Sequence, residues 1–329
     1  IKPTGILHLG NYFGAIKQMI DLVNSKNYES YIFLADYHSM TSLIDSKERI
    51  NNSKKILAAY LAFGLNKNKV NIFKQSDIKN ITELSWIFST ITPLSMLFLS
   101  HAYKDKISNE KEIDFKNINA GLFNYPILMA SDILIYNADI VPVGKDQEQH
   151  IEYTREIAKK YNNTYKTNTF KYPESFLIKN NELVVGIDGR KMSKSYDNII
   201  PIFEDENIIK KLIMSIKTDS KTPSEKKDPD ESIIFNIHKL FLNEEKTQEL
   251  RNRFINSEEK PYSYKEAKED LFDTILSYFK KEREKYNYFI NTKKGERELL
   301  SIIKNGAKNA NKRTEKTINT VRKETGLEF

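Results

Sequence analysis

Residues that could bind a phosphate stand near the N-terminus, in the segment Pro3-Thr4-Gly5-Ile6-Leu7-His8-Leu9-Gly10-Asn11. Gly10 precedes an amphipathic pattern over residues 16–23, so the backbone amides at the positive end of a helix could approach a phosphate there. His8 and Asn11 stand one turn apart at that end and could donate hydrogen bonds to phosphate oxygens. The alternative is an ordinary loop that carries a surface histidine.

A second candidate phosphate site is the basic segment Asp188-Gly189-Arg190-Lys191-Met192-Ser193-Lys194-Ser195. Gly186 and Gly189 make this segment flexible. Three cations within five residues could then clamp a phosphate. A solvated basic loop is the alternative for this segment taken alone.

A carboxylate interrupts an apolar pattern in the middle of the chain, Asp132 within residues 127–134 (ILMASDIL). Asp132 and Met129 are three residues apart and share one face of the predicted helix. A buried carboxylate needs a partner, and an indole N–H, which can only donate, suits that role. A neighbouring lysine, tyrosine or backbone group is the alternative partner.

Together, the two glycine-containing segments resemble the paired signatures of class I aminoacyl-tRNA synthetases. The middle of the chain is similar to bacterial tryptophanyl-tRNA synthetases at residues 125–132 (YPILMASD), 141–150 (VPVGKDQEQH) and 154–155. The similarity extends over nearly the whole chain. It therefore implies that the protein binds ATP and L-tryptophan and acts on tRNA(Trp).

The resemblance implies a reaction in two steps. The tryptophan carboxylate would attack ATP to give tryptophanyl-adenylate and pyrophosphate, and the tryptophanyl group would then pass to the 3′ adenosine of the tRNA. Mg²⁺ would be held mainly by the ATP phosphates, with no metal site in the protein itself. Two alternatives share part of the pattern: a tyrosyl-tRNA synthetase, and a non-tRNA nucleotidylyltransferase that makes small-molecule adenylates.

Site residues follow from the resemblance position by position. ATP would contact Lys2, Thr4, His8, Gly10, Asn11, Gly144, Asp146, Lys191, Met192, Ser193, Lys194 and Ser195. The catalytic group would be His8, Asn11, Lys191 and Lys194. Tryptophan would contact His38, Tyr125, Met129, Asp132, Val141, Val143 and Gln147. Asp132 would bind the indole nitrogen. His38 would line the ring pocket, or could instead be a core histidine. At position 2 this chain has lysine, where related enzymes often have glutamine.

The elements that must position these residues alternate between strand and helix over residues 1–201. Strands are predicted at 30–36, 69–74, 139–143 and 183–187, and helices at 46–65, 82–91, 126–136 and 146–161, with Pro126 at the first helical position. The alternation predicts an α/β domain with a Rossmann-like, doubly wound parallel sheet. Ligands bind at the carboxyl ends of such strands, where residues 35–38, 144–147 and 186–195 stand.

A second, α-helical domain is predicted over residues 202–329, because helical patterns then follow one another. They cover residues 204–216, 232–242, 244–255, 264–288 and 296–324, with a polar loop at 219–230. The resemblance implies that this domain recognises the tRNA anticodon arm, and that its last helix could pack on the catalytic domain. Four lysines at four-residue spacing could bind tRNA phosphates or form a solvated face: Lys304, Lys308, Lys312 and Lys316.

Composition excludes several classes of site. The 329 residues contain no cysteine, which excludes disulfides, iron–sulfur clusters, cysteine-bound zinc and a thiol nucleophile. No window approaches the ~18 apolar residues of a membrane helix, and no signal-type segment precedes the first motif. We therefore expect a cytoplasmic protein without membrane contact, missing a short N-terminal piece.

Charge and surface patterns suggest partners. The 52 Lys and Arg against 45 Asp and Glu give a net charge of +7, which favours a polyanionic partner such as tRNA. Residues 100–117 form a charged insertion between two sheet units. The apolar residues 86–99 could supply the interface of the homodimer that the resemblance implies, or belong to the core.

Overall fold

The computed structural model describes residues 5–25, 28–100, 104, 119–177, 184–256 and 259–328. The strands are β1 (Ser30–Leu34), β2 (Val70–Lys74), β3 (Ile140–Val143) and β4 (Glu174–Leu177). The helices among them are α1 (Leu9–Asn11), α2 (Lys17–Ser25), α3 (Asp36–Ser39), α4 (Ser46–Ala62), α5 (Ile81–Ile91), α6 (Leu94–Phe98), α8 (Ala120–Leu134) and α9 (Glu148–Tyr165). The later helices are α10 (Glu206–Met214), α11 (Ile233–His238), α12 (Glu244–Ile255), α13 (Tyr264–Tyr278), α14 (Lys280–Asn291) and α15 (Lys293–Thr325).

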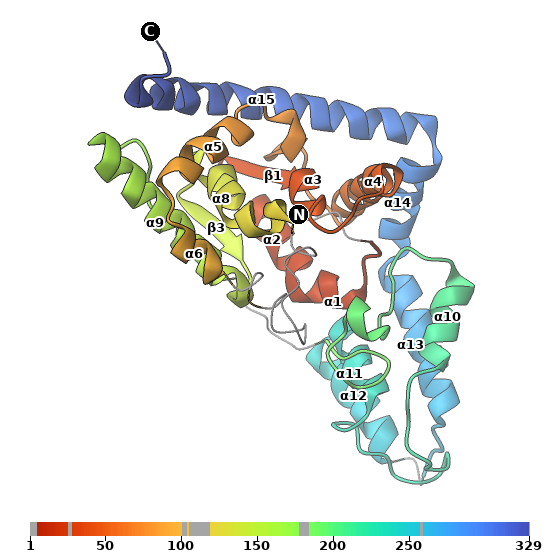
Figure 1. Ribbon diagram of the computed structural model, residues 1–329. Coiled ribbons are helices and arrows are strands. Elements are labelled where there is room, and N and C mark those ends of the chain that lie inside the picture. The colour runs from red at the N-terminus through yellow and green to blue at the C-terminus, as the bar shows by residue number, and fades with distance from the viewer. Residues whose placement is uncertain are drawn as a thin grey trace.

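The strands pair in parallel, as the alternation of strand and helix predicts. β1 pairs with β2, with Ile32 opposite Ile72, and β3 pairs with β4, with Val143 opposite Leu177. Within the described residues these are two separate two-stranded sheets, not one continuous sheet. The helices α2 to α9, which come from the same stretch of sequence as the strands, lie around both pairs of strands (Figure 1).

The strand predicted at residues 183–187 is wrong, and β4 takes its place beside β3. Val185 makes only an isolated antiparallel bridge to Lys191, because the chain turns back on itself between them at Gly186 and Gly189. β4 was missed because all four of its residues are exposed, so its sequence lacks the alternation of a half-buried strand.

Pro126 is not at the first position of its helix, contrary to the prediction. α8 begins six residues earlier, where the Asn119 side chain accepts a hydrogen bond from the Leu122 amide at 2.8 Å and caps the helix. Pro126 is buried inside α8 and cannot donate a hydrogen bond to the preceding turn. Packing of α8 against α5 and α9 holds the helix together across this gap.

The helix predicted at residues 264–288 is two helices, α13 and α14, with a break at Phe279. Phe279 is fully buried, and its ring contacts the rings of Tyr12, Phe63 and Phe241. This aromatic cluster fixes the chain at the break, although the local pattern alone would continue the helix. By contrast, α12 spans 244–255 as predicted, because Asn243 caps its first turn.

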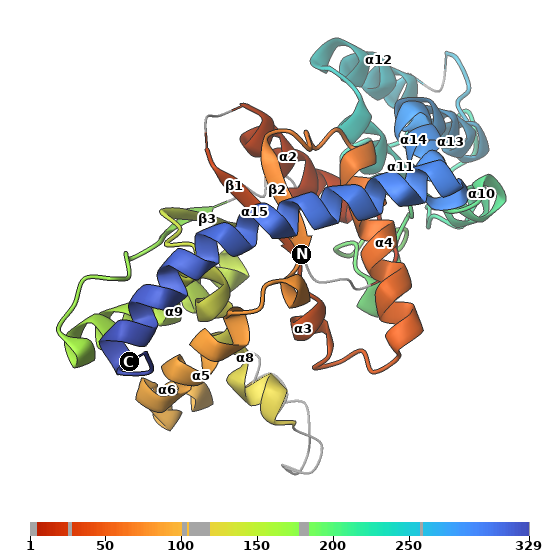
Figure 2. The same ribbon diagram turned by 90° about the horizontal axis from the view of Figure 1, so that it is seen from above.

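α15 crosses the strand-containing part on the side opposite to α11 and α12 (Figures 1 and 2). It packs along β2, and a Cβ at Gly306 would lie 2.0 Å from the Ile72 carbonyl oxygen, so only glycine allows this approach. Near its C-terminus, Arg322 donates two hydrogen bonds to Glu83, at 2.7 and 2.5 Å. The last helix is therefore anchored to the part of the chain that carries the strands.

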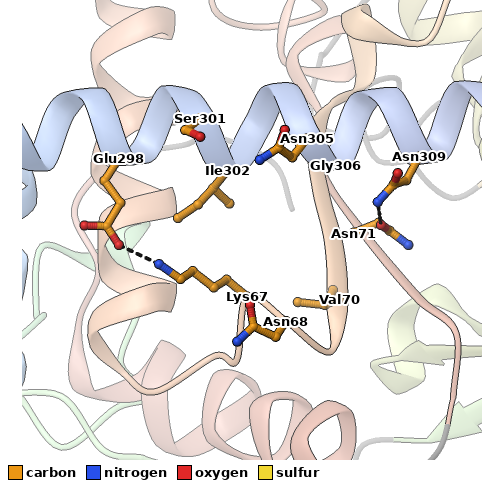
Figure 3. A pocket seen from close by; sticks show the side chains of 10 residues that line it. All are labelled: Lys67, Asn68, Val70, Asn71, Glu298, Ser301, Ile302, Asn305, Gly306 and Asn309. Carbon is orange, nitrogen blue, oxygen red and sulfur yellow. Dashed lines mark hydrogen bonds and ion pairs between the residues drawn. The ribbon is translucent and has the colours of Figure 1, made fainter.

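A cavity of about 210 Å³ lies between α15 and the segment that leads into β2 (Figure 3). Half of the residues that line it carry amide or hydroxyl side chains. Lys67 pairs with Glu298 at 2.8 Å, and Asn309 donates to Asn71 at 3.0 Å across it. The cavity thus lies among the polar contacts that hold α15 against β2, and we assign it no separate function.

The later helices share a core with both predicted phosphate-binding segments. Leu9 and Met192 are buried in the same apolar cluster as Ile209, Phe235 and Leu271. The helical part therefore supports the two segments directly. None of the helices within the described ranges is long and apolar enough to span a lipid bilayer.

Candidate active site

The two glycine-containing segments meet at the start of α1. The Leu9 amide donates to the Ile200 carbonyl at 3.0 Å, and the Ile202 amide donates to the Leu7 carbonyl at 3.1 Å. The Gly10 amide points at the Met192 sulfur, 3.3 Å away. Segments nearly two hundred residues apart in sequence therefore form one continuous surface.

Close packing at this junction leaves little room for a side chain at Gly10. A Cβ at Gly10 would lie 3.0 Å from Nδ1 of His8 and 3.3 Å from Cβ of Met192. The Asn11 side chain folds back, and its Oδ1 accepts a hydrogen bond from the His8 amide at 3.3 Å. Its Nδ2 is then the end of the amide that could donate to a ligand.

His8 is a buried, neutral histidine. Burial, with a smaller contribution from the positive charge of Lys194, lowers the pKa of His8 to about 4. Nδ1 of the ring is buried without a hydrogen-bond partner among the described residues. At pH 7 the ring can therefore donate one hydrogen bond to a phosphate oxygen without carrying a charge.

Buried histidines also make stability depend on pH. His238, in α11, resembles His8, since burial lowers its pKa to about 4 while its Nε2 contacts the Thr274 hydroxyl at 2.9 Å. The unfolded chain, with a histidine pKa near 6.5, binds more protons than the folded chain between pH 6.5 and 4. The free energy of unfolding should therefore fall as the pH falls through this window, by about 2 kcal/mol per histidine at pH 5.

The measurement is urea unfolding at pH 7 and pH 5 for the wild-type protein and for His238→Gln. The variant should lose less stability between the two pH values, because glutamine does not titrate. An equal loss in both proteins would show that His238 is not the source of the pH dependence.

The second segment places its cations differently. Lys191 and Lys194 are both exposed, but partial burial of its ammonium end lowers the pKa of Lys194. Nζ of Lys194 lies 3.4 Å from where a Cβ at Gly5 would stand. Ser193 is half-buried and Ser195 is exposed on the short turn that includes Lys194. Lys2 and Thr4, predicted ATP contacts, lie outside the described residues.

A cavity of about 420 Å³ opens on one side of Lys194, between the second segment and α4. Glu48, Glu204 and Asp197 line it together with Lys55. Three carboxylates make this cavity unfavourable for a polyanion. Phosphate groups are therefore better placed on the side of Lys194 that faces His8.

Asp132 lies at the centre of a second cluster. Its side chain is fully buried, and its Oδ2 lies 2.8 Å from Nε2 of His38. Nε2 of Gln75 donates to both carboxylate oxygens, at 2.9 and 2.8 Å. Burial raises the pKa of the Asp132 carboxyl, and the hydrogen bonds from His38 and Gln75 offset part of that effect.

Gln75 is a residue that the sequence analysis missed. It is fully buried, and its Oε1 accepts a hydrogen bond from the His38 amide at 3.3 Å, so one side chain orients both His38 and Asp132. The available signal was position: Gln75 follows β2 directly, as residues 35–38 follow β1. Asp36 ties these strand ends together by accepting hydrogen bonds from the Ser76 amide and hydroxyl, at 3.0 and 2.5 Å.

Several other predicted tryptophan contacts come from α8 and β3. Val141 and Val143 of β3 pack with Met129 of α8, one turn from Asp132. The Tyr125 hydroxyl contacts Nε2 of His150, and the Tyr125 ring lies edge-on to His38, with 6.1 Å between centroids.

The end of β3 leads into a short turn that carries the remaining predicted contacts. Gly144 precedes this turn, and its carbonyl accepts a hydrogen bond from the Gln147 amide at 2.9 Å. Asp146 lies on the turn, but its side chain is outside the described part. The structure thus places Gly144 and Gln147 at the carboxyl end of β3.

Comparison with known proteins identifies the family. The family model described as "tRNA synthetases class I (W and Y)" matches residues 1–280. A curated tryptophan–tRNA ligase of Campylobacter jejuni is 42% identical over 99% of this chain and 98% of its own length. This chain belongs to the bacterial tryptophanyl-tRNA synthetases.

Other relatives give the same assignment. A tryptophan–tRNA ligase of Fusobacterium nucleatum is 47% identical over 87% of this chain and 84% of its own length. The crystal structure of the Campylobacter jejuni tryptophanyl-tRNA synthetase complexed with ADP and tryptophan has a TM-score of 0.90, with 41% identity over 99% of this chain and 98% of that one. This similarity establishes the Rossmann-like class I fold, although the four described strands form two separate pairs and not one sheet.

One solved tyrosyl-tRNA synthetase matches the chain at low sequence identity. A tyrosyl-tRNA synthetase of Archaeoglobus fulgidus has a TM-score of 0.60 and 17% identity over 87% of this chain and 88% of that one, so it shares the fold alone. The remaining residues of this chain are therefore interpreted as those of a bacterial tryptophanyl-tRNA synthetase.

Two predicted features lie apart from the site. Lys304, Lys308, Lys312 and Lys316 are all exposed on α15, which crosses the molecule away from α1 (Figure 1). The predicted insertion at residues 100–117 lies outside the described residues except for Ser100 and Lys104. The described structure therefore does not join the lysines of α15 to the cluster around His8.

Proposed function

We propose that this protein activates L-tryptophan with ATP to tryptophanyl-adenylate and pyrophosphate, and then transfers the tryptophanyl group to the 3′ adenosine of tRNA(Trp). The observation that carries the proposal is the buried Asp132 carboxylate, held by Gln75 and His38 beside Met129 and the valines of β3. A fixed acceptor beside apolar side chains suits an indole ring with a single N–H. The family relationship supports the same substrate, because the Campylobacter jejuni relative was crystallised with ADP and tryptophan.

The activation step needs positioning and charge stabilisation. The tryptophan carboxylate is ionised at pH 7, so it can attack the α-phosphate without a general base. Negative charge then accumulates on the leaving pyrophosphate. His8 and Asn11 would donate hydrogen bonds to it, and Lys191 and Lys194 would neutralise it, which is how proteins accelerate phosphoryl and nucleotidyl transfer. The Gly10 amide and the start of α1 would contact the same phosphates.

The ATP ribose and the α-amino group of tryptophan are proposed to lie near the carboxyl end of β3 and the second segment. Gly144, Asp146, Met192, Ser193 and Ser195 are proposed to border the ATP ribose and phosphates. Tyr125 and Gln147 are proposed to bind the α-amino group of tryptophan. In the described residues, groups of three acidic or histidine side chains suited to a metal do not occur. We propose that Mg²⁺ arrives on ATP, where it neutralises phosphate charge.

The decisive experiment is amino-acid-dependent exchange between ATP and pyrophosphate, measured with tryptophan, with tyrosine and without amino acid. Exchange with tryptophan alone is expected, because Asp132 is proposed to be positioned for the indole N–H and not for the phenolic O–H of tyrosine, which stands elsewhere on its ring. Exchange with tyrosine would keep the fold and the phosphate site but overturn the pocket assignment. No exchange with either amino acid would reject adenylate formation as the function.

The chain is proposed to act as two domains, a catalytic domain at residues 1–201 and a tRNA-binding helical domain at residues 202–329, with α15 packed on the former. The apolar segment 86–99 supports a homodimer. Ile87 and Phe88 are in the core, whereas Trp86 is 72% exposed and Leu94 is 63% exposed, so one side of the segment is free to contact a second copy. Sedimentation of the full chain should give the mass of two copies.

The exposed lysines of α15 are proposed to contact tRNA backbone phosphates. Each phosphate contact contributes ~0.9 to the slope of log affinity against log salt for a duplex target. Lys308→Gln with Lys312→Gln should therefore reduce the salt dependence of tRNA(Trp) binding. Lys159→Gln with Lys160→Gln, two exposed lysines on α9, is the matched control. An unchanged slope in the α15 variant would remove these lysines from the tRNA interface.

A further inference from the structure

Asn198 lies just after the second phosphate-binding segment and is 1% exposed. Both ends of its side-chain amide are used by that segment. Oδ1 accepts a hydrogen bond from the Ser193 amide at 2.8 Å, while Nδ2 donates to Oδ1 of Asp188 at 2.7 Å and to the Lys191 carbonyl at 3.1 Å. One buried side chain therefore contacts the beginning, middle and end of the segment that carries the lysines.

The surrounding backbone is shaped to receive this amide. A Cβ at Gly186 would lie 2.4 Å from Cγ of Asn198, so glycine at 186 makes room for the side chain. The Ile187 amide donates to the Asn198 backbone carbonyl at 3.1 Å. The hydrogen bond from Asn198, together with Arg190, lowers the pKa of Asp188 to about 2, so this carboxylate is ionised and can only accept.

The chemistry of these contacts requires asparagine. The site needs one acceptor and two donors on a short planar group, which is what an asparagine amide supplies. Aspartate would lose both donors and place a second carboxylate against Asp188. Alanine would take away this partner from the Ser193 amide and the Lys191 carbonyl, whose hydrogen bonds to Asn198 are partly buried.

We propose that Asn198 is a positioning residue for adenylate formation: its amide fixes the segment so that Lys191 and Lys194 reach the leaving pyrophosphate. This inference rests on the proposed function. Lys191 is itself bonded through its carbonyl, and Lys194 follows Ser193 directly, so both lysines are within one residue of a backbone group that Asn198 holds. Met192, between them, is buried against Gly10 and pins the same segment from the other side.

The test compares Asn198→Ala and Asn198→Asp with a matched control, Asn162→Ala. Asn162 is also buried and also bonds a backbone amide and carbonyl, both of Phe170, but it lies on α9 away from the second segment. Exchange between ATP and pyrophosphate gives kcat and KM for ATP. Equilibrium dialysis gives tryptophan affinity without ATP, and amide hydrogen exchange reports on residues 184–198 in the absence of any substrate.

Both Asn198 variants should lose kcat by about 10²-fold, since a misplacement near 1 Å costs this much. Their tryptophan affinity should be unchanged, because the Asp132 cluster does not depend on Asn198. Their residues 184–198 should exchange faster than in the wild type. The Asn162 control should lose stability without the selective fall in kcat.

Each outcome decides a different point. Wild-type kcat in both Asn198 variants, or a loss of tryptophan affinity parallel to the loss of kcat, overturns the positioning role while leaving the proposed function intact. A wild-type protein without tryptophan-dependent exchange rejects the proposed function instead. In that case hydrogen exchange still decides whether Asn198 fixes the segment, and unaltered exchange in the variants would refute it.

Discussion

Asp132→Ala is expected to remove most of the selectivity for tryptophan over an analogue in which sulfur replaces the indole N–H. A site built around a hydrogen bond rejects a substrate that lacks the donor, by a factor of up to about 10⁴ where the acceptor is left wholly unpaired. Asp132 keeps its hydrogen bonds from Gln75 and His38, so the factor here should be smaller. The alanine variant has no carboxylate at this position, so it gains nothing from the indole N–H and loses nothing when the analogue lacks it. The ratio of kcat/KM for the two substrates, measured by exchange between ATP and pyrophosphate, should therefore fall towards one.

The cost in stability should be smaller. Removing the carboxylate leaves Gln75 and His38 without their acceptor, at about 1–3 kcal/mol for an unpaired buried group. It also removes a buried acid whose charged form is disfavoured, as the raised pKa of Asp132 shows. Ser131→Ala is the matched control, because Ser131 is the buried neighbour on α8 and its hydroxyl bonds only back to Ile127 at 3.0 Å in its own helix.

Asp132→Asn adds a graded test. Its amide keeps one acceptor oxygen but replaces the other with a donor, which opposes the donating Nε2 of Gln75. We expect selectivity between that of the wild type and that of the alanine variant. Wild-type selectivity in Asp132→Ala would show that another group binds the indole nitrogen.

Lys194→Ala is expected to lower kcat for adenylate formation by about 10²–10³, the usual effect of removing one group that stabilises charge in the transition state. Lys194 is the cation close enough to His8 to lower its pKa, and its side chain is partly withdrawn from water. Its ammonium end is partly shielded from water, so its charge acts more strongly on a phosphate than the charge of a fully solvated lysine.

The control for Lys194 is Lys217→Ala. Lys217 is exposed, and its backbone amide bonds the Ile187 carbonyl at 3.1 Å, so it adjoins the same segment without carrying its side chain into the site. Lys194→Ala should leave tryptophan affinity unchanged, and Lys217→Ala should leave all parameters near wild type. A loss of tryptophan affinity in Lys194→Ala would mean that the substitution disturbs the whole site.

The amino-acid sequence determined the chemistry of this protein and much of its local structure. The two candidate phosphate-binding segments, Asp132 among apolar residues and the strand–helix alternation were all visible without coordinates. The limits of α12 could also be predicted, because a cap such as Asn243 acts through a hydrogen bond between residues near in sequence.

Tertiary structure decided the features that depend on contacts between distant residues. The break at Phe279, the helix that continues through Pro126 and the path of α15 over β2 all follow from packing that overrides local preference. Gln75 and Asn198 are ordinary polar residues in the sequence. Each gains its role only because folding buries it beside groups that must be hydrogen-bonded once water is excluded.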